Sequence, residues 1–325
     1  MILEALAMIG GLVMLVWSAD RFVLGASGLA SNFGVSPLLI GMLIVGFGTS
    51  APEILVSVTA ASSGNTGLAV GNALGSNIAN IGLVLGSAAL ITPLVVDSKI
   101  LRREFPVLLA VSLLVAGMFY DLEFTRLEGV LLLFGLGVFL AWMYYLSKKT
   151  PKTSDPLESE YDAEVPRDMA MGRAWMWTVL GLLFLVASAN ALVWGAVGIA
   201  KFFGVSDLLI GLTIVAVGTS LPEVAVSITA ALKKEHEIVL GNVIGSNLFN
   251  LLAVLGIAAA IHPSTLQAHV FSRDIVVMLL GTIAIFITGY GFRGAGKVNR
   301  IEATLLLSGY FAYMYWLYAT EVRIT

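Results

Sequence analysis

The chain has no cysteine and few charged residues. Without thiols it can form no disulfide and offers no thiolate ligand to a metal ion. Charged side chains occupy 12% of the 325 positions, whereas soluble domains carry roughly 25%, so an ordinary soluble fold is excluded. Hydrophobic residues make up 58% of the chain, and the mean hydropathy is +0.94. Together these values indicate a protein that lies in a bilayer.

Ten apolar segments each reach the length of about 20 residues that spans a membrane. They cover roughly residues 2–30, 37–62, 68–91, 104–120, 126–147, 173–203, 207–232, 237–261, 272–292 and 299–321. We therefore predict an all-α membrane protein with ten transmembrane helices. The first and sixth segments are the longest, which permits a strong tilt. No basic stretch precedes the first segment, so we interpret it as a retained helix and not as a cleaved signal peptide.

Residues 148–172 form the one substantial polar stretch. It contains three prolines and several acidic residues, and few of its side chains are apolar. Such a composition offers little burial to offset the entropy of ordering, so we expect a linker. The predicted units are a first five-helix repeat at residues 1–147, this linker, and a second five-helix repeat at residues 173–325.

Two sequence motifs occur twice at a constant offset. Gly-Phe-Gly-Thr-Ser-Ala-Pro-Glu at residues 46–53 returns as Ala-Val-Gly-Thr-Ser-Leu-Pro-Glu at residues 216–223, and 223 − 53 = 170. Gly-Asn-x-x-Gly-Ser-Asn-x-x-Asn at residues 71–80 returns at residues 241–250 with the same offset. The chain thus consists of two related halves of five segments. Because five is odd, the second half is inverted, and the sequence predicts an inverted-topology repeat.

The distribution of lysine and arginine predicts the orientation. With the linker in the cytoplasm, thirteen of these residues fall on the cytoplasmic side and four on the outer side. Arg21 lies inside the first segment and is not counted. We therefore expect a multi-pass protein of the plasma membrane (the inner membrane of a bacterial cell), with both termini outside and the 148–172 loop cytoplasmic.

Glu53 and Glu223 lie in the middle of apolar segments, where a carboxylate is expensive and its usual meaning is functional. Each follows a proline that removes a helical hydrogen bond and leaves a carbonyl without its donor. In hydrocarbon such carbonyls need a partner, and a cation can be that partner. A structural alternative is a proline kink satisfied by a neighbouring hydroxyl. Because the acid recurs beside the proline in both halves, the sequence favours an ion-binding site at the interface of the repeats.

The second motif adds neutral oxygen atoms. Asn72, Ser76 and Asn80 are spaced four residues apart and share one helix face, and the same spacing recurs in the second half as Asn242, Ser246 and Asn250. The glycines four residues apart in each copy let helix backbones approach closely. We expect Ser76, Asn80, Ser246 and Asn250 to be ligands, since they lie nearest the kinks. We expect Asn72, Asn77, Asn242 and Asn247 to join helices by hydrogen bonds.

These residues form an all-oxygen ligand set, which suits Ca²⁺ with its six to eight oxygen ligands. Mg²⁺ demands a tighter octahedron, and metals that prefer nitrogen or sulfur lack ligands here. With both glutamates ionised the site carries a charge of −2, which one Ca²⁺ or sodium ions on overlapping oxygens can neutralise. Competition for one pair of carboxylates is the simplest physical basis for antiport.

The paired motifs resemble the alpha repeats of the cation/Ca²⁺ exchanger superfamily, in particular prokaryotic sodium/calcium exchangers, and the resemblance covers nearly the whole chain. It implies that Glu53 and Glu223 bind Ca²⁺ together with the backbone carbonyls of Thr49 and Thr219. It also implies Na⁺ binding by the serines Ser50, Ser76, Ser220 and Ser246 and by the backbone carbonyls of Gly46 and Ala216. The family has alanine at the position of Gly46. The resemblance further implies exchange of about three Na⁺ for each Ca²⁺, with the first and sixth helices sliding across the other eight.

This sequence departs from the family at two positions. Sodium/calcium exchangers often carry aspartate where this chain has Asn250, and potassium-dependent relatives have acids at the positions of both Asn80 and Asn250. The two amides argue against potassium cotransport and leave two carboxylates in the site. Asp20 in the first segment has Asn190 as its counterpart, so we expect it to be a structural ion-pair residue in preference to a gate residue.

The leading hypothesis is therefore a Na⁺/Ca²⁺ antiporter and not an enzyme. A Ca²⁺/H⁺ antiporter is the alternative, because buried glutamates can take up protons. An intramembrane enzyme would need a nucleophile–base pair near the motifs, and none is present. A channel is disfavoured because inverted repeats with broken helices are typical of alternating access. We expect no cofactor, nucleic acid or protein partner; the partners are Ca²⁺, Na⁺ and the lipid bilayer.

Overall fold

The computed structural model describes residues 2–34, 37–64, 66–96, 101–149, 169–202, 216–290 and 296–321. The first half begins with the long helix α1 (Ile2–Phe33). It continues through α2 (Pro37–Ile40), the π-helical segment η1 (Gly41–Gly46), α3 (Phe47–Thr49), α4 (Ala51–Ser62), α5 (Thr66–Ala79), the π-helical segment η2 (Asn80–Leu85), α6 (Gly86–Ile91), α7 (Leu101–Met118) and α8 (Arg126–Lys149). The 148–172 linker lies largely outside the described residues.

The second half begins with α10 (Met171–Phe202). It continues through α12 (Ala216–Thr219), α13 (Leu221–Leu232), α14 (His236–Phe249), η4 (Asn250–Val254), α15 (Leu255–Ile261), η5 (Val270–Ile275), α16 (Val276–Tyr290) and α17 (Arg300–Glu321). The helices α3, α4 and α5 and the segment η2, which carry most of the motif residues, have the counterparts α12, α13, α14 and η4 here. The start of the seventh predicted segment, residues 207–215, lies outside the described residues.

Six helices in the described part of the chain are long and apolar enough to cross a membrane. The pair Gly41–Thr49 and Ala51–Ser62, bent by 48°, would make a seventh span. Two further apolar helices, Glu104–Met118 and Leu221–Leu232, are shorter, and α17 coincides with the last predicted segment. Long apolar helices therefore dominate the fold, as predicted, and the count of ten spans stays a prediction.

The centre of the bundle consists of two long helices, one from each half. Of the apolar window of Thr66–Ile91, 72% is buried, and of that of His236–Ile261, 83%, against 22% for α1 and 28% for α10. Both central helices contain a π-helical segment, which widens the turn and re-aims the side chains around it. These two helices also carry the second motif, so the fold places that motif deepest inside.

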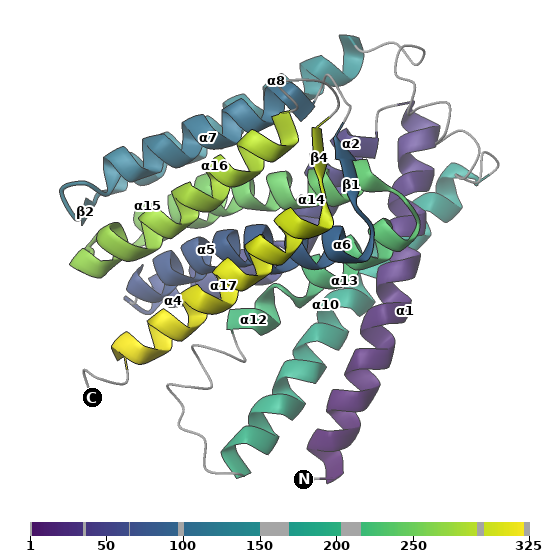
Figure 1. Cartoon of the computed structure of the whole chain (residues 1–325), viewed down its shortest axis with the longest axis horizontal. Helices are drawn as coiled ribbons and strands as arrows, with labels where there is room; N and C mark the ends of the chain where they lie inside the picture. The colour runs from purple at the N-terminus through teal and green to yellow at the C-terminus, as the bar shows by residue number, and fades with distance from the viewer. Residues whose placement is uncertain are drawn as a thin grey trace.

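The helices α1 and α10 run side by side at one edge of the molecule (Figure 1) and both have 32 residues, which confirms the prediction that the first and sixth segments are the longest. Their contact is unusually close. A β-carbon on Gly11 would lie 2.8 Å from the backbone nitrogen of Leu192, and one on Gly181 would lie 2.7 Å from that of Phe22. We call this line of backbone contact the glycine seam.

Gly25 and Gly195, the counterparts of each other across the 170-residue offset, extend the glycine seam. A β-carbon on Gly25 would collide with the backbone of Thr178, and one on Gly195 with the backbone of Glu4 and Met8. Small residues allow helix backbones to approach closely in a membrane, where packing drives association. The two outer helices thus touch backbone to backbone at these glycines, and Trp17 of α1 packs on Trp177 and Phe184 of α10 beside them.

Two short antiparallel sheets connect the halves. β1 (Leu94–Val96) pairs with β4 (Gly296–Val298), with Leu94 opposite Val298. β2 (Glu123–Phe124) pairs with β3 (Ser264–Thr265), with Phe124 opposite Ser264. Each sheet takes one strand from each half, so the connections between helices hold the halves together at both ends of the bundle.

Asp20 is held as the sequence predicts, by a neighbouring cation. Its carboxylate lies 2.8 Å from Nζ of Lys233 and 3.8 Å from Nε of Arg21. Lys233 also donates to the backbone oxygen of Asp20. Nearby, the hydroxyl of Ser27 donates to Oε2 of Glu235 at 2.5 Å. Together these contacts tie α1 to the turn between α13 and α14, and we call them the α1 latch.

Candidate cation site

Both proline motifs break their helices at a serine. Ser50 has φ −82° and ψ 4°, and Ser220 has φ −87° and ψ 3°, so neither is helical. The next helix then starts with a proline in its first turn, a position where the missing N–H matters little. Each break therefore places a glutamate in the first turn of a new helix, where the helix dipole favours a negative charge.

Glu53 and Glu223 are fully buried, with 0% and 1% of their surfaces exposed. The hydroxyl of Ser50 donates to Oε1 of Glu223 at 3.2 Å, so the first break touches the second glutamate. Ser76 donates to Oε1 of Glu53 at 3.4 Å. The two carboxylates interact electrostatically, and each keeps Oε2 without a protein partner among the described residues. The structure thus brings the two copies of the proline motif together in one buried site.

Threonines from both breaks add further hydroxyls around the carboxylates. Thr219 interacts with Glu53, and Thr49 with Glu223. The hydroxyl of Thr49 also lies 3.0 Å from the carbonyl of Val45, to which it donates. Each glutamate is therefore surrounded by hydroxyls from both halves of the chain.

Ser246 links the second motif to the first break. Its hydroxyl donates to the backbone carbonyl of Gly46 at 3.2 Å and lies 3.4 Å from the hydroxyl of Thr49. The Ser246 hydroxyl also interacts with the carboxylate of Glu223. A β-carbon on Gly46 would lie 3.0 Å from the backbone nitrogen of Ser246, so glycine permits this approach. On the partner helix, a β-carbon on Gly245 would lie 2.7 Å from the carbonyl oxygen of Met42. The second motif thus packs directly on η1.

Asn72 and Asn242 support the backbone of the two glutamates. Asn72 donates to the carbonyl of Glu53 at 3.2 Å, and Asn242 donates to that of Glu223 at 3.3 Å. Each amide also contacts a serine four residues after the glutamate: Asn72 lies 3.4 Å from Ser57 and Asn242 lies 2.9 Å from Ser227. The asparagines therefore join helices, as predicted. The serines were missed, although their recurrence at the 170-residue offset is a signal that could have found them.

The remaining expected ligands are less completely placed. Asn80 and Asn250 are buried, and they begin η2 and η4. Ser220 is buried, and its hydroxyl has no partner among the described residues. Ala216 is the first residue of α12, and the described range begins with it. The surroundings of its side chain are not among the described features.

In the part of the chain that the structure describes, no group of three or more His, Cys, Asp and Glu residues could hold a metal ion. The site instead combines two carboxylates with hydroxyl, amide and carbonyl oxygens. Such hard oxygen ligands suit Ca²⁺ and Na⁺ and not metals that prefer nitrogen or sulfur. Ligation by neutral oxygens keeps the total charge low enough for cations to leave again.

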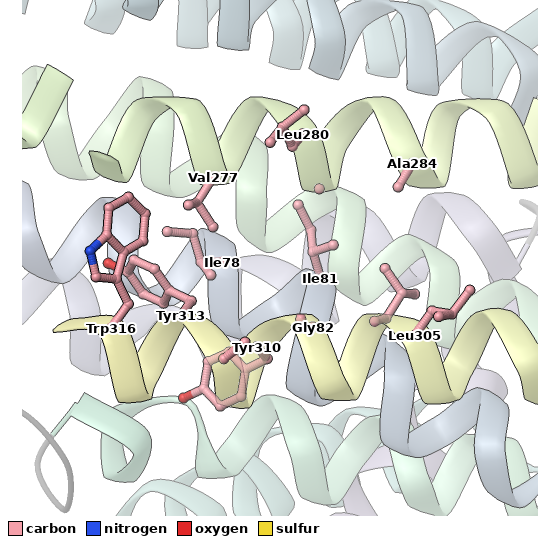
Figure 2. Close-up of a pocket in the computed structure, with 14 residues that line it drawn as sticks. Ile78, Ile81, Gly82, Val277, Leu280, Ala284, Leu305, Tyr310, Tyr313 and Trp316 are labelled. Carbon is pink, nitrogen blue, oxygen red and sulfur yellow. The ribbon is translucent and has the colours of Figure 1, made fainter. Parts of the chain in front are cut away.

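A separate cavity of about 410 Å³ lies between η2, α16 and α17, away from the glutamates. Figure 2 shows Val277, Leu280 and Ala284 on α16 facing Ile78 and Ile81 of the central helix. No charged side chain lines this cavity among the described residues. Its apolar walls cannot replace the hydration shell of a cation, so it is not the cation site.

The chain is similar to known membrane proteins over nearly its whole length. A family model described as sodium/calcium exchanger protein matches residues 3–145 and 173–319. The inner membrane protein YrbG of Escherichia coli strain K12 is 40% identical over 321 residues, covering 98% of both chains. The sodium/calcium exchanger MaX1 of Methanosarcina acetivorans is 30% identical over 355 aligned positions, covering 95% of this chain and 96% of its own. A solved structure of the sodium-calcium exchanger NCX_Mj matches with a TM-score of 0.83 and 31% identity, over 96% of this chain and 97% of that one.

Proposed function

Because the chain belongs to the sodium/calcium exchanger family, we propose that it exchanges Na⁺ for Ca²⁺ across the membrane by alternating access. One observation carries this proposal. Glu53 and Glu223, from opposite halves, meet in a buried site, and each keeps one carboxylate oxygen without a protein partner among the described residues. Two buried like charges need a cation, and a transported cation supplies it.

The proposed Ca²⁺ ligands are the carboxylates of Glu53 and Glu223 with the backbone carbonyls of Thr49 and Thr219. The proposed Na⁺ ligands are further oxygens around them, from Ser50, Ser76, Ser220, Ser246, Asn80, Asn250 and the carbonyls of Gly46 and Ala216. The hydrogen bonds from Ser50 and Ser76 to the carboxylates support this overlap, since an ion on either serine oxygen lies beside a glutamate. Overlapping sites make Na⁺ and Ca²⁺ exclude each other, which is the condition for exchange.

We extend the proposal to the architecture. Residues 1–147 and 173–325 form two inverted repeats of five helices, joined by the cytoplasmic linker 148–172. The two sheets support this arrangement, because each joins connections that the predicted topology puts on the same side of the membrane. A hydrogen bond from Asn32 to the carbonyl of Met169 likewise joins two segments expected in the cytoplasm.

Both termini outside and a plasma-membrane location complete the proposal. The thirteen-to-four distribution of basic residues supports the orientation. The bacterial relative named as an inner membrane protein supports the location. The family model and the structural neighbour NCX_Mj are sodium/calcium exchangers, which supports a transporter in preference to an enzyme.

The coupling ion is tested with purified protein in sealed proteoliposomes. Vesicles loaded with Na⁺ and diluted into Na⁺-free buffer should accumulate radiolabelled Ca²⁺, because outward Na⁺ movement drives Ca²⁺ inward. A pH gradient alone, at equal Na⁺ on both sides, should drive little uptake. Uptake that follows the pH gradient and ignores Na⁺ would assign the chain to Ca²⁺/H⁺ exchange instead.

A further inference from the structure

Four buried asparagines lie on the two central helices, and hydrogen bonds join three of them, Asn77, Asn80 and Asn247. Asn77 and Asn80 come from the first half, and Asn247 and Asn250 occupy the equivalent positions of the second, each at an offset of 170 residues. Their exposed fractions are 1%, 1%, 0% and 0%. Asn80 and Asn250 are proposed ion ligands, whereas Asn77 and Asn247 lie one helical turn before them. Asn77 and Asn247 thus have no role assigned so far beyond joining helices.

The hydrogen bonds within the cluster run in one direction. Asn80 donates from Nδ2 to Oδ1 of Asn247 at 3.1 Å. Asn77 donates from Nδ2 to the backbone carbonyl of Asn247 at 3.3 Å, and its Nδ2 lies 3.8 Å from the sulfur of Met278. Both bonds pass from the first half to the second, so Asn247 accepts twice.

The two symmetry-related bonds are not formed. They would run from Nδ2 of Asn250 to Oδ1 of Asn77, and from Nδ2 of Asn247 to the carbonyl of Asn77. All three side-chain atoms named here are buried and have no hydrogen-bond partner among the described residues. The serines show the same imbalance: Ser50 donates to Glu223, while the hydroxyl of its counterpart Ser220 is unpartnered. The two halves therefore have similar sequences but different hydrogen bonds at these residues.

This asymmetry has a consequence for the ligands. Because Nδ2 of Asn80 is bound to Asn247, its amide is fixed and Oδ1 is the atom left for a cation. Neither end of the Asn250 amide is held by a protein group among the described residues. A fixed oxygen binds a cation better than an amide that can turn its N–H groups toward it.

We propose that Asn77 and Asn247 are positioning residues that fix the amides of Asn250 and Asn80 in alternation, one in each access state. In this state Asn247 holds Asn80; in the opposite state Asn77 holds Asn250 and the bonds seen here are broken. The exchange replaces two hydrogen bonds by two equivalent ones, so the two states stay close in free energy, as a reversible carrier requires. This inference rests on alternating access from the proposed function, but not on the identity of the coupling ion.

The test uses Ca²⁺–Ca²⁺ exchange, which needs neither a Na⁺ nor a proton gradient. The concentration of Ca²⁺ giving half-maximal exchange is measured from each face, in right-side-out and in inside-out membrane vesicles. Asn247→Ala should raise this concentration on the order of tenfold at one face and less than about twofold at the other, as expected for one lost buried hydrogen bond. Asn77→Ala should do the same at the opposite face.

Two further variants separate positioning from packing. Asn247→Asp keeps an acceptor oxygen for Asn80, so it should not show the loss of affinity that Asn247→Ala shows at that face. Asn190→Ala, on the exposed side of α10, is the matched control and should change neither face. Equal weakening at both faces by Asn77→Ala and Asn247→Ala, or a loss in Asn247→Asp as large as in Asn247→Ala, would overturn the proposal.

A second measurement does not depend on the alanine variants folding. A structure of the unsubstituted protein in the opposite access state should have Nδ2 of Asn250 within hydrogen-bond distance of Oδ1 of Asn77. The same one-directional bonds in both access states would overturn the inference. Absence of Ca²⁺ exchange by the unsubstituted protein would instead remove the proposed function, and this inference with it.

Discussion

The carboxylates of Glu53 and Glu223 differ from an ordinary buried ion pair in what surrounds them. In the part of the chain that the structure describes, hydroxyl groups contact them, and no lysine or arginine is paired with either. Hydroxyls can donate to a carboxylate and can also turn to present their oxygen to a cation. The same side chains can therefore serve an empty and an occupied site.

Replacing either glutamate by glutamine should nearly abolish Ca²⁺ transport. Glu53→Gln or Glu223→Gln keeps the shape of the side chain but leaves a charge of −1 against a divalent ion in a buried site, where charge interactions are strong. We expect the initial rate of Ca²⁺ uptake to fall by about a hundredfold or more, which corresponds to roughly 3 kcal/mol. Radiolabelled Ca²⁺ uptake into proteoliposomes measures this rate.

Glu123→Gln is the matched control for these variants. Glu123 is exposed, in β2, and its substitution also removes one carboxylate, so uptake should be unchanged. Wild-type uptake by Glu53→Gln would mean that the buried glutamates do not bind the transported ion. Loss of folded protein on size-exclusion chromatography would show that the effect is structural.

The sequence predicted which residues lie at the candidate site more fully than it predicted which groups they bond to. The two glutamates followed from the cost of charge in a membrane and from the repeat, Ser76 followed from its helix face, and Ser50 followed from the family resemblance. The sequence predicted that Asn72 joins helices by a hydrogen bond, but it did not predict that the acceptor is the backbone carbonyl of Glu53. The direction of the bond from Asn80 to Asn247 could not be predicted, because it depends on how two helices far apart in sequence cross.

At the scale of elements, the crossing of η1 and α14 depends on a missing β-carbon. Gly245→Ala would put a methyl group 2.7 Å from the carbonyl oxygen of Met42, and backbone on both sides cannot move aside. We expect a loss of about 1–3 kcal/mol of stability, typical of overpacking, and a lower rate of transport. Thermal unfolding in detergent measures the first and Ca²⁺ uptake the second.

Gly137→Ala gives the comparison for that substitution. Gly137 lies in α8, and a β-carbon there meets no described atom within 4 Å. Alanine in place of glycine inside a helix stabilises by roughly 0.5–1 kcal/mol, so the unfolding temperature should stay level or rise. Equal behaviour of the two variants would show that the close crossing is not needed.

The α1 latch should slow the movement of α1 without adding much stability. The side chains of Lys233 and Asp20 are 30% and 41% exposed, and ion pairs of that exposure contribute about 1 kcal/mol or less. We therefore expect Asp20→Asn to raise the rate of Ca²⁺–Ca²⁺ exchange up to about fivefold, since less energy holds α1 in place. High salt should shrink the difference, because ions screen the exposed pair.

Exchanging the charges tests the pair itself. Asp20→Lys combined with Lys233→Asp should return the exchange rate toward that of the unsubstituted protein. Asn190→Ala, at the position equivalent to Asp20 in the second half, should leave the rate unaltered. A rate in Asp20→Asn that equals that of the unsubstituted protein at low salt would show that the latch does not limit the movement.

At the scale of the whole molecule, hydropathy and the repeat predicted the location of the helices well, because span length is set by bilayer thickness. They could not predict the π-helical segments at Asn80 and Asn250, which depend on local packing between helices. Nor could they predict the two sheets, whose strands of two or three residues carry too short a pattern to recognise.

The predicted orientation can be measured directly because the chain has no cysteine, so a single introduced thiol reports without background. Thr153→Cys, in the 148–172 loop, should react with a membrane-impermeant maleimide only in inside-out vesicles. Thr265→Cys, exposed in β3, should react only in right-side-out vesicles. Both sites reacting from the same face would contradict the ten-span inverted topology.

The glycine seam between α1 and α10 limits how the carrier can fail. The backbones of the two helices touch along Gly11, Gly25, Gly181 and Gly195, and Trp17 of α1 also packs on Trp177 and Phe184 of α10, so neither helix can move alone without breaking these contacts. We expect them to travel as one rod, so that the path on one face closes as the other opens. A cell that keeps steep ion gradients loses stored energy through any pore that opens at both ends. The seam would thus protect against leak, at the cost of making every turnover wait for two large helices to move together.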